Sequence, residues 1–311
     1  MRTIALFGPT GVGKTAVAVA LARALRERGE DPVAVSADAL QVYRGLETLT
    51  GVASAQERAE LEHRLVSIVP VDATFSAGQY AELAHAEIDD LLAQGRRPIV
   101  VGGTGLYLRA ALADLDLRPP PPEGVRERWI TELTAQGAPA LHALLRQRAP
   151  RAAAEIDPND SQRVVRALEL HDLGELPDPE TGEPPEGSGE GDARSQLWSE
   201  DLRHPTLLVG LVMGREALYA AIDARVLAMV AAGAADEVRA AHAAGASETA
   251  RKALGFEDLL AGDVARMQRR TRNYAKRQLT WLRKLPAVNV IDVGERSPDD
   301  VAREILDCGP L

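Results

Sequence analysis

The sequence is short of cysteine and of long apolar runs. Cys308 is the one cysteine among 311 residues, so no disulfide can form within the chain, as is typical of proteins in a reducing compartment. No stretch approaches the roughly 18 consecutive apolar residues of a membrane-spanning helix, and the apolar run 3–7 is too short for the core of a signal peptide. We therefore expect a cytoplasmic protein with no membrane partner.

Basic residues are also in the minority. Lys and Arg number 36 against 46 Asp and Glu, which gives a formal net charge of 36 − 46 = −10. Such a balance argues against a generic nucleic-acid-binding protein, although a net charge is a sum and binding is local. Aromatic residues are few, with 3 Phe, 3 Trp and 5 Tyr, so aliphatic side chains must fill the core.

Segments typical of strands and of helices alternate at both ends of the chain. Apolar runs predict strands at 2–7, 32–36, 97–101, 206–212 and 288–293. Apolar residues at helical spacing predict helices at 15–28, 57–64, 77–93, 215–231, 234–244 and 264–284, and a last one from 298. This alternation is typical of an α/β protein with a doubly wound parallel sheet.

The middle of the chain does not follow this alternation. After four prolines at Pro119–Pro122, residues 123–173 are typical of consecutive helices. The segment Glu175–Asp192 holds seven acids, four Pro and four Gly but no base, a composition too polar to offset its ordering entropy. We therefore expect a core of 1–115 and 200–311, a helical insertion at 116–174 and an acidic flexible loop at 175–199.

A glycine-rich turn with a lysine follows the first predicted strand and opens the first helix. Its sequence, GPTGVGKT at Gly8–Thr15, satisfies G-x-x-x-x-G-K-[ST] in the required strand–turn–helix context. The glycines let backbone N–H groups converge on an anion, the helix N-terminus adds its dipole, and Lys14 adds a point charge. The Thr15 hydroxyl can bind Mg²⁺. We call this segment the phosphate loop, and it predicts a P-loop core.

The phosphate loop alone favours a nucleoside triphosphate, but the usual hydrolytic acid is missing. P-loop NTPases place an Asp after an apolar strand to organise Mg²⁺, whereas strand 97–101 ends in Gly102–Gly105 and strand 206–212 in Met213-Gly214. Only Asp38 ends a predicted strand, which suggests a diphosphate that leaves rather than a transferred phosphoryl group. Asp38 is explained equally well as a general base or Mg²⁺ contact and as a turn residue.

Three further features are open to two interpretations each. The glycine turn, Gly102–Gly105, allows close backbone approach and offers Thr104 to the site, or it is a strand-to-helix connection capped by Thr104. The glutamine and arginines of 159–169 (NDSQRVVRALE) contact nucleic acid, or they form a solvated helix face. Arg225 is a surface ion-pair residue unless the phosphate loop lies nearby.

One predicted helix differs in charge from the rest of the chain. The segment Arg266–Lys284 holds eight bases and no acid, which leaves 28 − 46 = −18 for the remaining residues. Tyr274 and Trp281 within it offer stacking faces for bases. A solvated helix docked by its leucines explains Leu279 and Leu282 but not the absence of acids. We call this segment the basic helix and expect it to contact RNA.

The combination resembles the tRNA dimethylallyltransferases, also called tRNA isopentenyltransferases, over nearly the whole chain. The motifs that carry the resemblance are GPTGVGKT at 8–15, SADALQVYRG at 36–45, FSAGQYAELA at 75–84, PIVVGGTGLYLRAAL at 98–112, DPNDSQRVVRALE at 157–169, ARKALGFEDL at 250–259 and AKRQLTWLRK at 275–284. The resemblance implies transfer of a dimethylallyl group from dimethylallyl diphosphate to the exocyclic amine of the adenine 3′-adjacent to the anticodon, in the tRNA anticodon stem-loop, with diphosphate released.

The resemblance also implies roles for individual residues. Asp38, the general base, and Thr104 would be catalytic, and Thr15 would bind Mg²⁺. Diphosphate would be bound by Gly8, Pro9, Thr10, Gly11, Val12, Gly13, Lys14, Thr15 and Arg225. Transfer RNA would be contacted by Asp38, Ala39, Leu40, Gln41, Thr104, Arg126, Gln162, Arg163, Val164, Val165, Arg166, Arg251, Lys252, Gly255, Lys276, Arg277, Gln278, Trp281 and Arg283. We expect a monomer.

Two departures from the family pattern and three alternatives accompany this interpretation. The family commonly carries a DIGTAK-like run where this chain has LETLTG at 46–51, and Glu175–Asp192 resembles a lineage-specific insertion. The alternatives are a small-molecule P-loop kinase, an enzyme that prenylates free adenine nucleotides and a non-catalytic RNA-binding protein. The basic helix opposes the first two, and the intact Lys14, Thr15 and Asp38 oppose the third.

Overall fold

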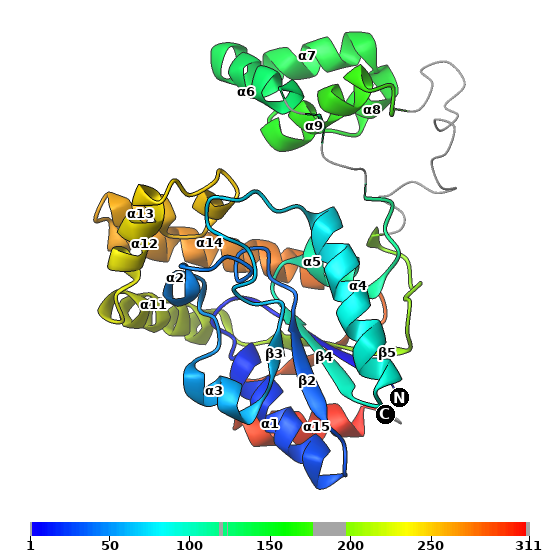
Figure 1. Cartoon of the computed structure of the whole chain (residues 1–311), viewed down its shortest axis with the longest axis vertical. Helices are drawn as coiled ribbons and strands as arrows, with labels where there is room; N and C mark the ends of the chain where they lie inside the picture. The colour runs from blue at the N-terminus through cyan, green and yellow to red at the C-terminus, as the bar shows by residue number, and fades with distance from the viewer. Residues whose placement is uncertain (1, 118–120, 123, 177–196, 309–311) are drawn as a thin grey trace. The chain divides into compact units, whose positions relative to one another are not determined.

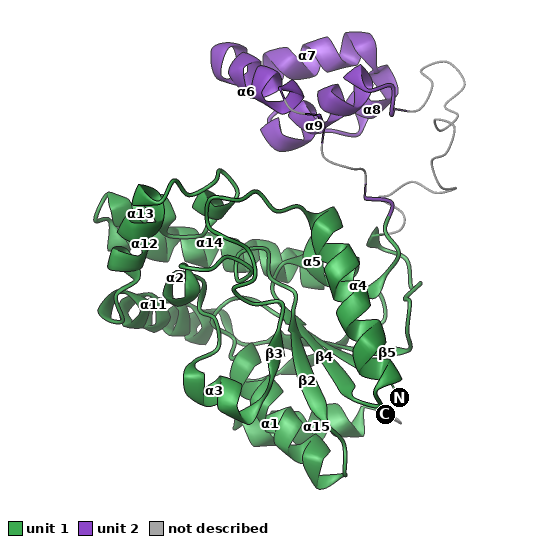
Figure 2. Cartoon of the chain, in the orientation of Figure 1, with its two compact units in different colours: residues 1–115, 194–311 green, residues 116–193 purple. Residues whose placement is uncertain are grey.

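A computed structural model describes residues 2–117, 121–122, 124–176 and 197–308. The chain divides into two compact units (Figure 2). Unit 1 comprises Met1–Leu115 and Arg194–Leu311, and unit 2 comprises Asp116–Ala193. The acidic loop predicted at 175–199 lies outside the described residues, except for Glu175, Leu176 and residues 197–199.

Unit 1 is built on a six-stranded sheet with the order β3-β2-β4-β1-β5-β6 (Figure 1). Every neighbouring pair is parallel, and Ile4 on β1 lies opposite Ile99 on β4 and Leu207 on β5. The strands are β1 (Thr3–Phe7), β2 (Pro32–Ser36), β3 (His63–Arg64), β4 (Arg97–Gly102), β5 (Thr206–Val212) and β6 (Asn289–Asp292). The predicted α/β fold with a parallel sheet is confirmed.

Helices cover both faces of this sheet (Figure 1). On one face α1 (Lys14–Glu27) packs against α15 (Pro298–Asp307), over a core that includes Ile4 and Leu6 of β1. On the other face α4 (Ala77–Ala93) packs against α5 (Gly105–Leu112). Successive side chains of a strand point to opposite faces, so the fully buried β1 serves both layers.

A second group of helices lies beyond the carboxyl ends of the strands. It comprises α2 (Glu47–Thr50), α11 (Arg215–Ala231), α12 (Ala234–Ala243), η1 (Ala250–Lys252), α13 (Phe256–Leu260) and α14 (Val264–Leu282). Helix α3 (Ala55–Glu60) packs beside α1 instead. Helices α2 and α11–α14 share an apolar cluster around Tyr43, Phe256 and Met267. No single described helix is long and apolar enough to cross a membrane, although α11 and α12 together, bent by 63°, reach that length and composition.

One predicted helix is wrong at its end. We expected a helix over 57–64, but α3 ends at Glu60 and β3 pairs with Ala34 and Val35 at the edge of the sheet. The chain becomes extended at Leu61, whose side chain is fully buried. A strand of two residues is too short to show a period in the sequence.

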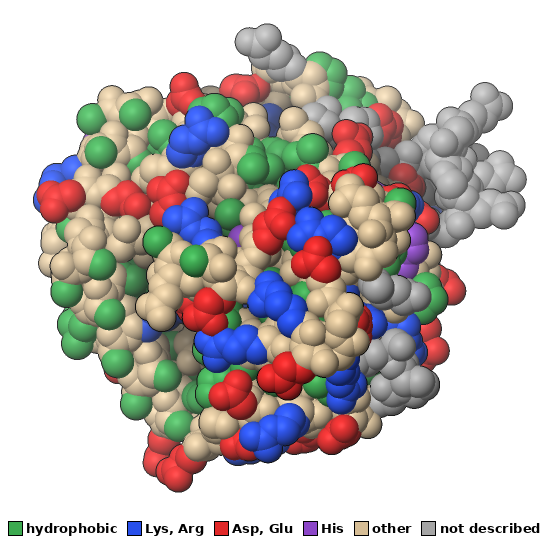
Figure 3. Space-filling view, turned by 60° about the horizontal axis from the view of Figure 1, so that its bottom comes forward, with side chains coloured by type: hydrophobic (Ala, Val, Ile, Leu, Met, Phe, Trp, Pro, Cys, Tyr) green, Lys and Arg blue, Asp and Glu red, His purple; other side chains and the backbone are tan. Residues whose placement is uncertain are grey.

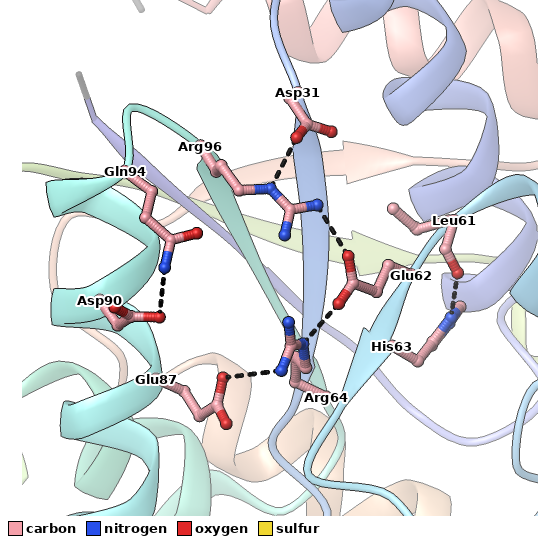
Figure 4. Close-up of polar contacts among 9 residues, drawn as sticks. All are labelled: Asp31, Leu61, Glu62, His63, Arg64, Glu87, Asp90, Gln94 and Arg96. Carbon is pink, nitrogen blue, oxygen red and sulfur yellow. Dashed lines mark hydrogen bonds and ion pairs between the residues drawn. The ribbon is translucent and has the colours of Figure 1, made fainter.

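Ion pairs join the edge strand to its neighbours (Figure 4). The Arg96 guanidinium donates to Asp31, just before β2, and to Glu62, just before β3. Arg64 on β3 pairs with Glu62 at 2.6 Å and with Glu87 on α4 at 3.8 Å. Arg96, Asp31 and Glu62 lie at the amino ends of the strands, so this network stands apart from the polar residues at the carboxyl ends. Figure 3 shows basic and acidic side chains similarly interspersed on one face of the molecule.

Unit 2 is helical, as the sequence predicts for this segment. Its helices are α6 (Val125–Gln136), α7 (Ala138–Arg148), α8 (Pro150–Ala154) and α9 (Ser161–Asp172). They enclose a small core of their own around Trp129, Leu145 and Leu168. The Asp160 carboxylate accepts the backbone N–H of Arg163 and so caps α9.

Candidate active site

A cavity of about 690 Å³ opens at the carboxyl ends of the parallel strands of unit 1. Ligands bind at this edge in open α/β sheets because loops from neighbouring strands converge there. Of the residues predicted for the site, those that line the cavity are Thr10, Gly11, Gly13, Lys14, Thr15, Asp38, Leu40, Gln41, Arg225 and Gln278. The structure therefore brings the phosphate loop, Asp38 and Arg225 together.

The phosphate loop owes its shape to glycine. Gly11 and Gly13 have φ of 85° and 91°, a region that other residues rarely adopt, and a Cβ on Gly11 would lie 2.9 Å from Ile222. Helix α1 begins at Lys14 with no side-chain cap, so its first N–H groups have no partner in the helix. Such amides together with the helix dipole form an anion site.

The other loop residues have structural roles. The carbonyl oxygens of Gly8 and Pro9 accept hydrogen bonds from the Lys14 amine at 2.8 and 3.0 Å. The Val12 side chain is buried in the core of unit 1, and its N–H donates to the Pro9 carbonyl at 3.3 Å. Gly8, Pro9 and Val12 do not line the cavity, so they shape the loop rather than face the ligand.

Two half-buried cations line this cavity. Burial, and to a lesser extent the nearby Arg225 guanidinium, lower the pKa of Lys14 from 10.5 to about 7, and Asp38 only partly opposes them. Burial likewise lowers the pKa of Arg225, against the influence of Asp38 and Glu57. Among the residues that the structure describes, the Nε of Arg225 has no hydrogen-bond partner. Two poorly solvated cations beside open amides are suited to a multiply charged anion.

Gly51 makes room for the Arg225 guanidinium, and the sequence did not identify it. It ends α2 with φ of 63°, and a Cβ there would lie 1.9 Å from Nη2 of Arg225. In the sequence, the only indication that this segment is unusual was its departure from the family pattern at 46–51 (LETLTG). Helix α2 is held in turn by Glu237 of α12, whose carboxylate accepts the N–H groups of Thr48 and Leu49 at 2.9 and 2.7 Å.

Asp38 is both a turn residue and a cavity residue. Its Oδ1 accepts the N–H of Leu40 at 2.9 Å, as the turn interpretation predicts, and its side chain lines the cavity, as the general-base interpretation requires. Gln41 accepts from Ser36 at 2.9 Å and donates to the Gly51 carbonyl at 3.1 Å. Ala39 does not line the cavity.

Thr104 lies beside the cavity wall rather than in it. It occupies the N-cap position of α5, but its side chain caps no N–H, so the capping interpretation is wrong in that respect. Its hydroxyl lies 3.4 Å from that of Tyr274, which lines the cavity. Burial raises the pKa of Tyr274 to about 12, so this phenol keeps its proton at neutral pH.

The basic helix corresponds to α14 and its C-terminal extension, and its charges fall into two groups. Arg266 and Arg270 pair with the buried Asp258 at 3.2 Å, and Arg272 pairs with Asp223 at 2.6 Å. The acids that the segment lacks therefore come from neighbouring helices. Within the described parts of the chain, the bases that have no acidic partner are Arg269, Lys276, Arg277, Arg283 and Lys284.

Two residues of the basic helix that were predicted to bind tRNA have other contacts. Gln278 is buried, and its side chain bonds to the backbone of the phosphate loop and of the glycine turn. Trp281 packs on Gly105, where a Cβ would lie 2.1 Å from its ring, and its ring centroid lies 4.6 Å from that of Trp198. These partners occupy the Gln278 amide and part of the Trp281 ring.

The remaining predicted tRNA contacts lie in unit 2 or on the helices after α12. Val164 and Val165 belong to the core of unit 2, so their side chains offer no surface to RNA. Gln162 is exposed on α9, and Arg163 pairs with Asp160 at 3.4 Å. Arg126 and Arg166 both bond to the buried Glu169. Arg251 pairs with Glu257 at 2.7 Å. Lys252 is exposed, and Gly255 has a φ of 99°.

A first prediction concerns the space at Gly51. We expect Gly51→Ala to displace the Arg225 guanidinium and to weaken pyrophosphate binding about tenfold, the equivalent of about 1.4 kcal/mol, measured by isothermal titration calorimetry. Gly45→Ala is the matched control, because Gly45 also has positive φ (85°) but has no heavy atom within 4 Å of its Cβ position. Equal losses in both variants would assign the effect to backbone strain.

A second prediction concerns the proton on Lys14. A bound polyanion raises the pKa of Lys14 above its value of about 7, so binding takes up protons between pH 7 and the new pKa. Pyrophosphate affinity should therefore fall as the pH rises above 7, by up to about tenfold per unit. Calorimetry in buffers of different ionisation enthalpy measures the uptake.

Lys14→Arg is the control for this measurement. Arginine stays charged at every pH used, so the uptake that Lys14 causes should vanish while the protonation of pyrophosphate itself remains. An unchanged proton uptake in Lys14→Arg would contradict the assignment.

Comparisons with known proteins identify the family. The IPP transferase family model matches residues 41–285. A tRNA dimethylallyltransferase of Kineococcus radiotolerans is 41% identical over 99% of this chain and 96% of its own length. One of Thermobifida fusca is 39% identical over 92% of this chain and 88% of its own length.

Solved structures agree with this. A tRNA isopentenylpyrophosphate transferase of Bacillus halodurans is 31% identical, with a TM-score of 0.67 over 98% of this chain and 94% of its own. A eukaryotic dimethylallyltransferase acting on tRNA, 22% identical, has the same fold, with a TM-score of 0.71 over 99% of this chain and 76% of its own. The chain therefore belongs to the IPP transferase family, together with the tRNA dimethylallyltransferases.

Proposed function

We propose that this chain transfers a dimethylallyl group from dimethylallyl diphosphate to the exocyclic amine of the adenine 3′-adjacent to the anticodon of tRNA, releasing diphosphate. Prenyl transfer to tRNA is the activity of its family. The observation that carries the finer proposal is the cavity itself. It brings two half-buried cations and the open amides of α1 together with the carboxylate of Asp38, and Glu47 and Glu57 also line it.

The anion site fits the diphosphate of the donor. The first amides of α1, the Lys14 amine and the Arg225 guanidinium converge on the same cavity. Charge builds up on diphosphate as its bond to the allylic carbon breaks, so donors fixed in advance stabilise the transition state more than the ground state. The site therefore favours departure of a whole diphosphate.

Magnesium fits this site as a partner of the diphosphate. The Thr15 hydroxyl and the Asp38 carboxylate both line the cavity and are hard oxygen ligands of the kind Mg²⁺ takes. No three His, Cys, Asp or Glu side chains gather to hold a metal in the described ranges, so Mg²⁺ would take most ligands from diphosphate and water. When bound, Mg²⁺ supplies positive charge that neutralises the diphosphate.

Asp38 is placed to accept the proton that the reaction releases. The adenine, taken out of its stack, presents its amine to the cavity. The nitrogen–carbon bond forms, the carbon–oxygen bond breaks with its electron pair going to diphosphate, and Asp38 takes a proton from the amine. The Leu40 N–H holds Oδ1 of Asp38, which leaves Oδ2 for this proton.

The basic helix supplies the surface for tRNA. Its five bases without an acidic partner in the described residues include Lys276 and Arg277, and such bases are available to RNA phosphates. Every described residue that lines the cavity belongs to unit 1, and we propose that the enzyme acts as a monomer.

The test of this function is transfer of label. The protein is incubated with radiolabelled dimethylallyl diphosphate and an unmodified tRNA with adenine after the anticodon. We expect label in that tRNA, with equimolar diphosphate, and none in a tRNA with guanine at this position. Label only in added AMP would assign the chain to nucleotide prenylation, and ADP formation from ATP without label transfer would assign it to the kinases.

A third prediction concerns Asp38 in the same assay. Asp38→Asn keeps an oxygen for the Leu40 N–H but loses the base, so kcat should fall by about 10²–10⁴-fold. The Kd for tRNA, measured by filter binding, should stay within about twofold. Asp72→Asn, at an exposed aspartate, is the control. Equal losses in kcat and tRNA affinity would make Asp38 a binding residue instead.

A further inference from the structure

The Gln278 side chain links helix α14 to the phosphate loop. The Oε1 of Gln278 accepts the N–H of Thr10 at 2.8 Å, and its Nε2 donates to the carbonyl of Gly103 at 2.8 Å. We infer that Gln278 is a positioning residue, which fixes the phosphate loop against the glycine turn for the diphosphate and does not contact tRNA. The inference rests on the proposed function only in taking diphosphate as the ligand.

The surroundings of Gln278 show why its amide matters. It is 4% exposed and shares the buried face of α14 with Met267, Ala275 and Leu282. A buried amide is unfavourable unless both of its ends are hydrogen-bonded, and here both ends bond to backbone of other segments. An apolar residue would fill the same face without that requirement. What the amide adds is therefore the tie between two loops.

Gly103 is the point at which these parts meet. A Cβ there would lie 2.3 Å from Nε2 of Gln278, 3.2 Å from the Gly8 oxygen and 3.4 Å from Nζ of Lys14. The Lys14 amine in turn donates to the Gly8 and Pro9 carbonyls. Gln278 thus fixes the position of the peptide groups on which the Lys14 amine rests.

The backbone N–H groups of the phosphate loop and of α1 have two different roles in this arrangement. The N–H of Thr10 is used by Gln278 and that of Val12 by the Pro9 carbonyl, so these two hold the shape of the loop. The first amides of α1, from Lys14 onward, remain for the anion. Without Gln278, the Thr10 N–H loses its partner, and the peptide group between Pro9 and Thr10 is held by its carbonyl oxygen, which accepts from Lys14 and Val12.

The same helix carries the bases proposed for tRNA. Lys276 and Arg277 are exposed and precede Gln278 directly, and successive side chains of a helix point about 100° apart. One rigid element therefore presents charges outward and an amide inward. The two roles can be separated by mutation.

The experiment compares Gln278→Met with Gln268→Met in the full chain. Both replace an amide of α14 by a near-isosteric apolar side chain, but Gln268 bonds to the Asp223 carbonyl at 3.4 Å and lies away from the cavity. Calorimetry with inorganic pyrophosphate should show Gln278→Met weakened about tenfold, the range of one lost buried hydrogen bond, and Gln268→Met unchanged. In steady state, the KM for dimethylallyl diphosphate should rise by the same factor with kcat within about threefold.

A tRNA-binding measurement on the same variants distinguishes a positioning role of Gln278 from direct contact with RNA. Filter binding should give Gln278→Met the wild-type Kd for tRNA, whereas the double variant K276A/R277A should bind tRNA more weakly. An unchanged pyrophosphate Kd in Gln278→Met, or a loss of tRNA affinity equal to that of the double variant, would overturn the inference. Pyrophosphate binding without label transfer would overturn only the proposed function, and a wild-type chain that does not bind pyrophosphate would overturn both.

A second variant covers the case in which Gln278→Met does not fold. Gln278→Asn keeps a buried amide but withdraws it by one methylene, so it should lose the same pyrophosphate affinity. Amide hydrogen exchange adds a direct readout. The Thr10 N–H should exchange at least about tenfold faster in Gln278→Asn, with the amides of β1 unchanged. An unchanged exchange rate at Thr10 would contradict the inference.

Discussion

Two positive charges close together in one cavity are the constraint on which this structure depends. Lys14 and Arg225 are both half-buried, and Asp38 is the carboxylate that opposes them most directly. Burying a charge without a partner is among the least favourable events in folding. The fold accepts this arrangement because β1, β2 and the later helices all converge on the same edge of the sheet. A bound polyanion would offset the excess positive charge of Lys14 and Arg225, so its binding should also stabilise the folded protein.

Several glycines leave room for side chains at this site. Gly51 leaves space for the Arg225 guanidinium, Gly103 for the Gln278 amide and Gly11 for the side chain of Ile222. Each glycine lies on a different loop, and a Cβ at each would lie closer than 3.0 Å to that side chain. The second positive charge beside the phosphate loop, Arg225, comes from α11.

The long elements could be predicted from the sequence because they carry their own signal. The bounds of β2, α4, β5 and α11 agree with the predicted ones, since each has a clear apolar period and clear ends. Helices α2 and α13 have four and five residues and were missed. The end of α3 before Leu61 was also missed, because burial of a single side chain gives no hydrophobic period in the sequence.

The same distinction, between residues with a local sequence signal and residues whose partners are distant, applies to the candidate site. The phosphate loop and Asp38 could be found because strand, turn and helix are contiguous there. Arg225 could be placed only by resemblance, since its neighbours come from distant segments. Gln278 was assigned to tRNA by the same resemblance, whereas its contacts in space are two backbone groups. The counterions of the basic helix, Asp223 and Asp258, were likewise invisible because they lie on other helices.

The order of the strands has a consequence for synthesis of the chain. Strand β1 is central and pairs with β4 on one side and with β5 on the other, and β5 follows the whole of unit 2 in the sequence. The phosphate loop therefore leaves the ribosome before the insertion, whereas Arg225 and Gln278 emerge only after it. A nascent or truncated chain that ends before α11 has the loop but neither its flanking cation nor its brace. The complete anion site can therefore form only after the insertion and α14 have both been synthesised.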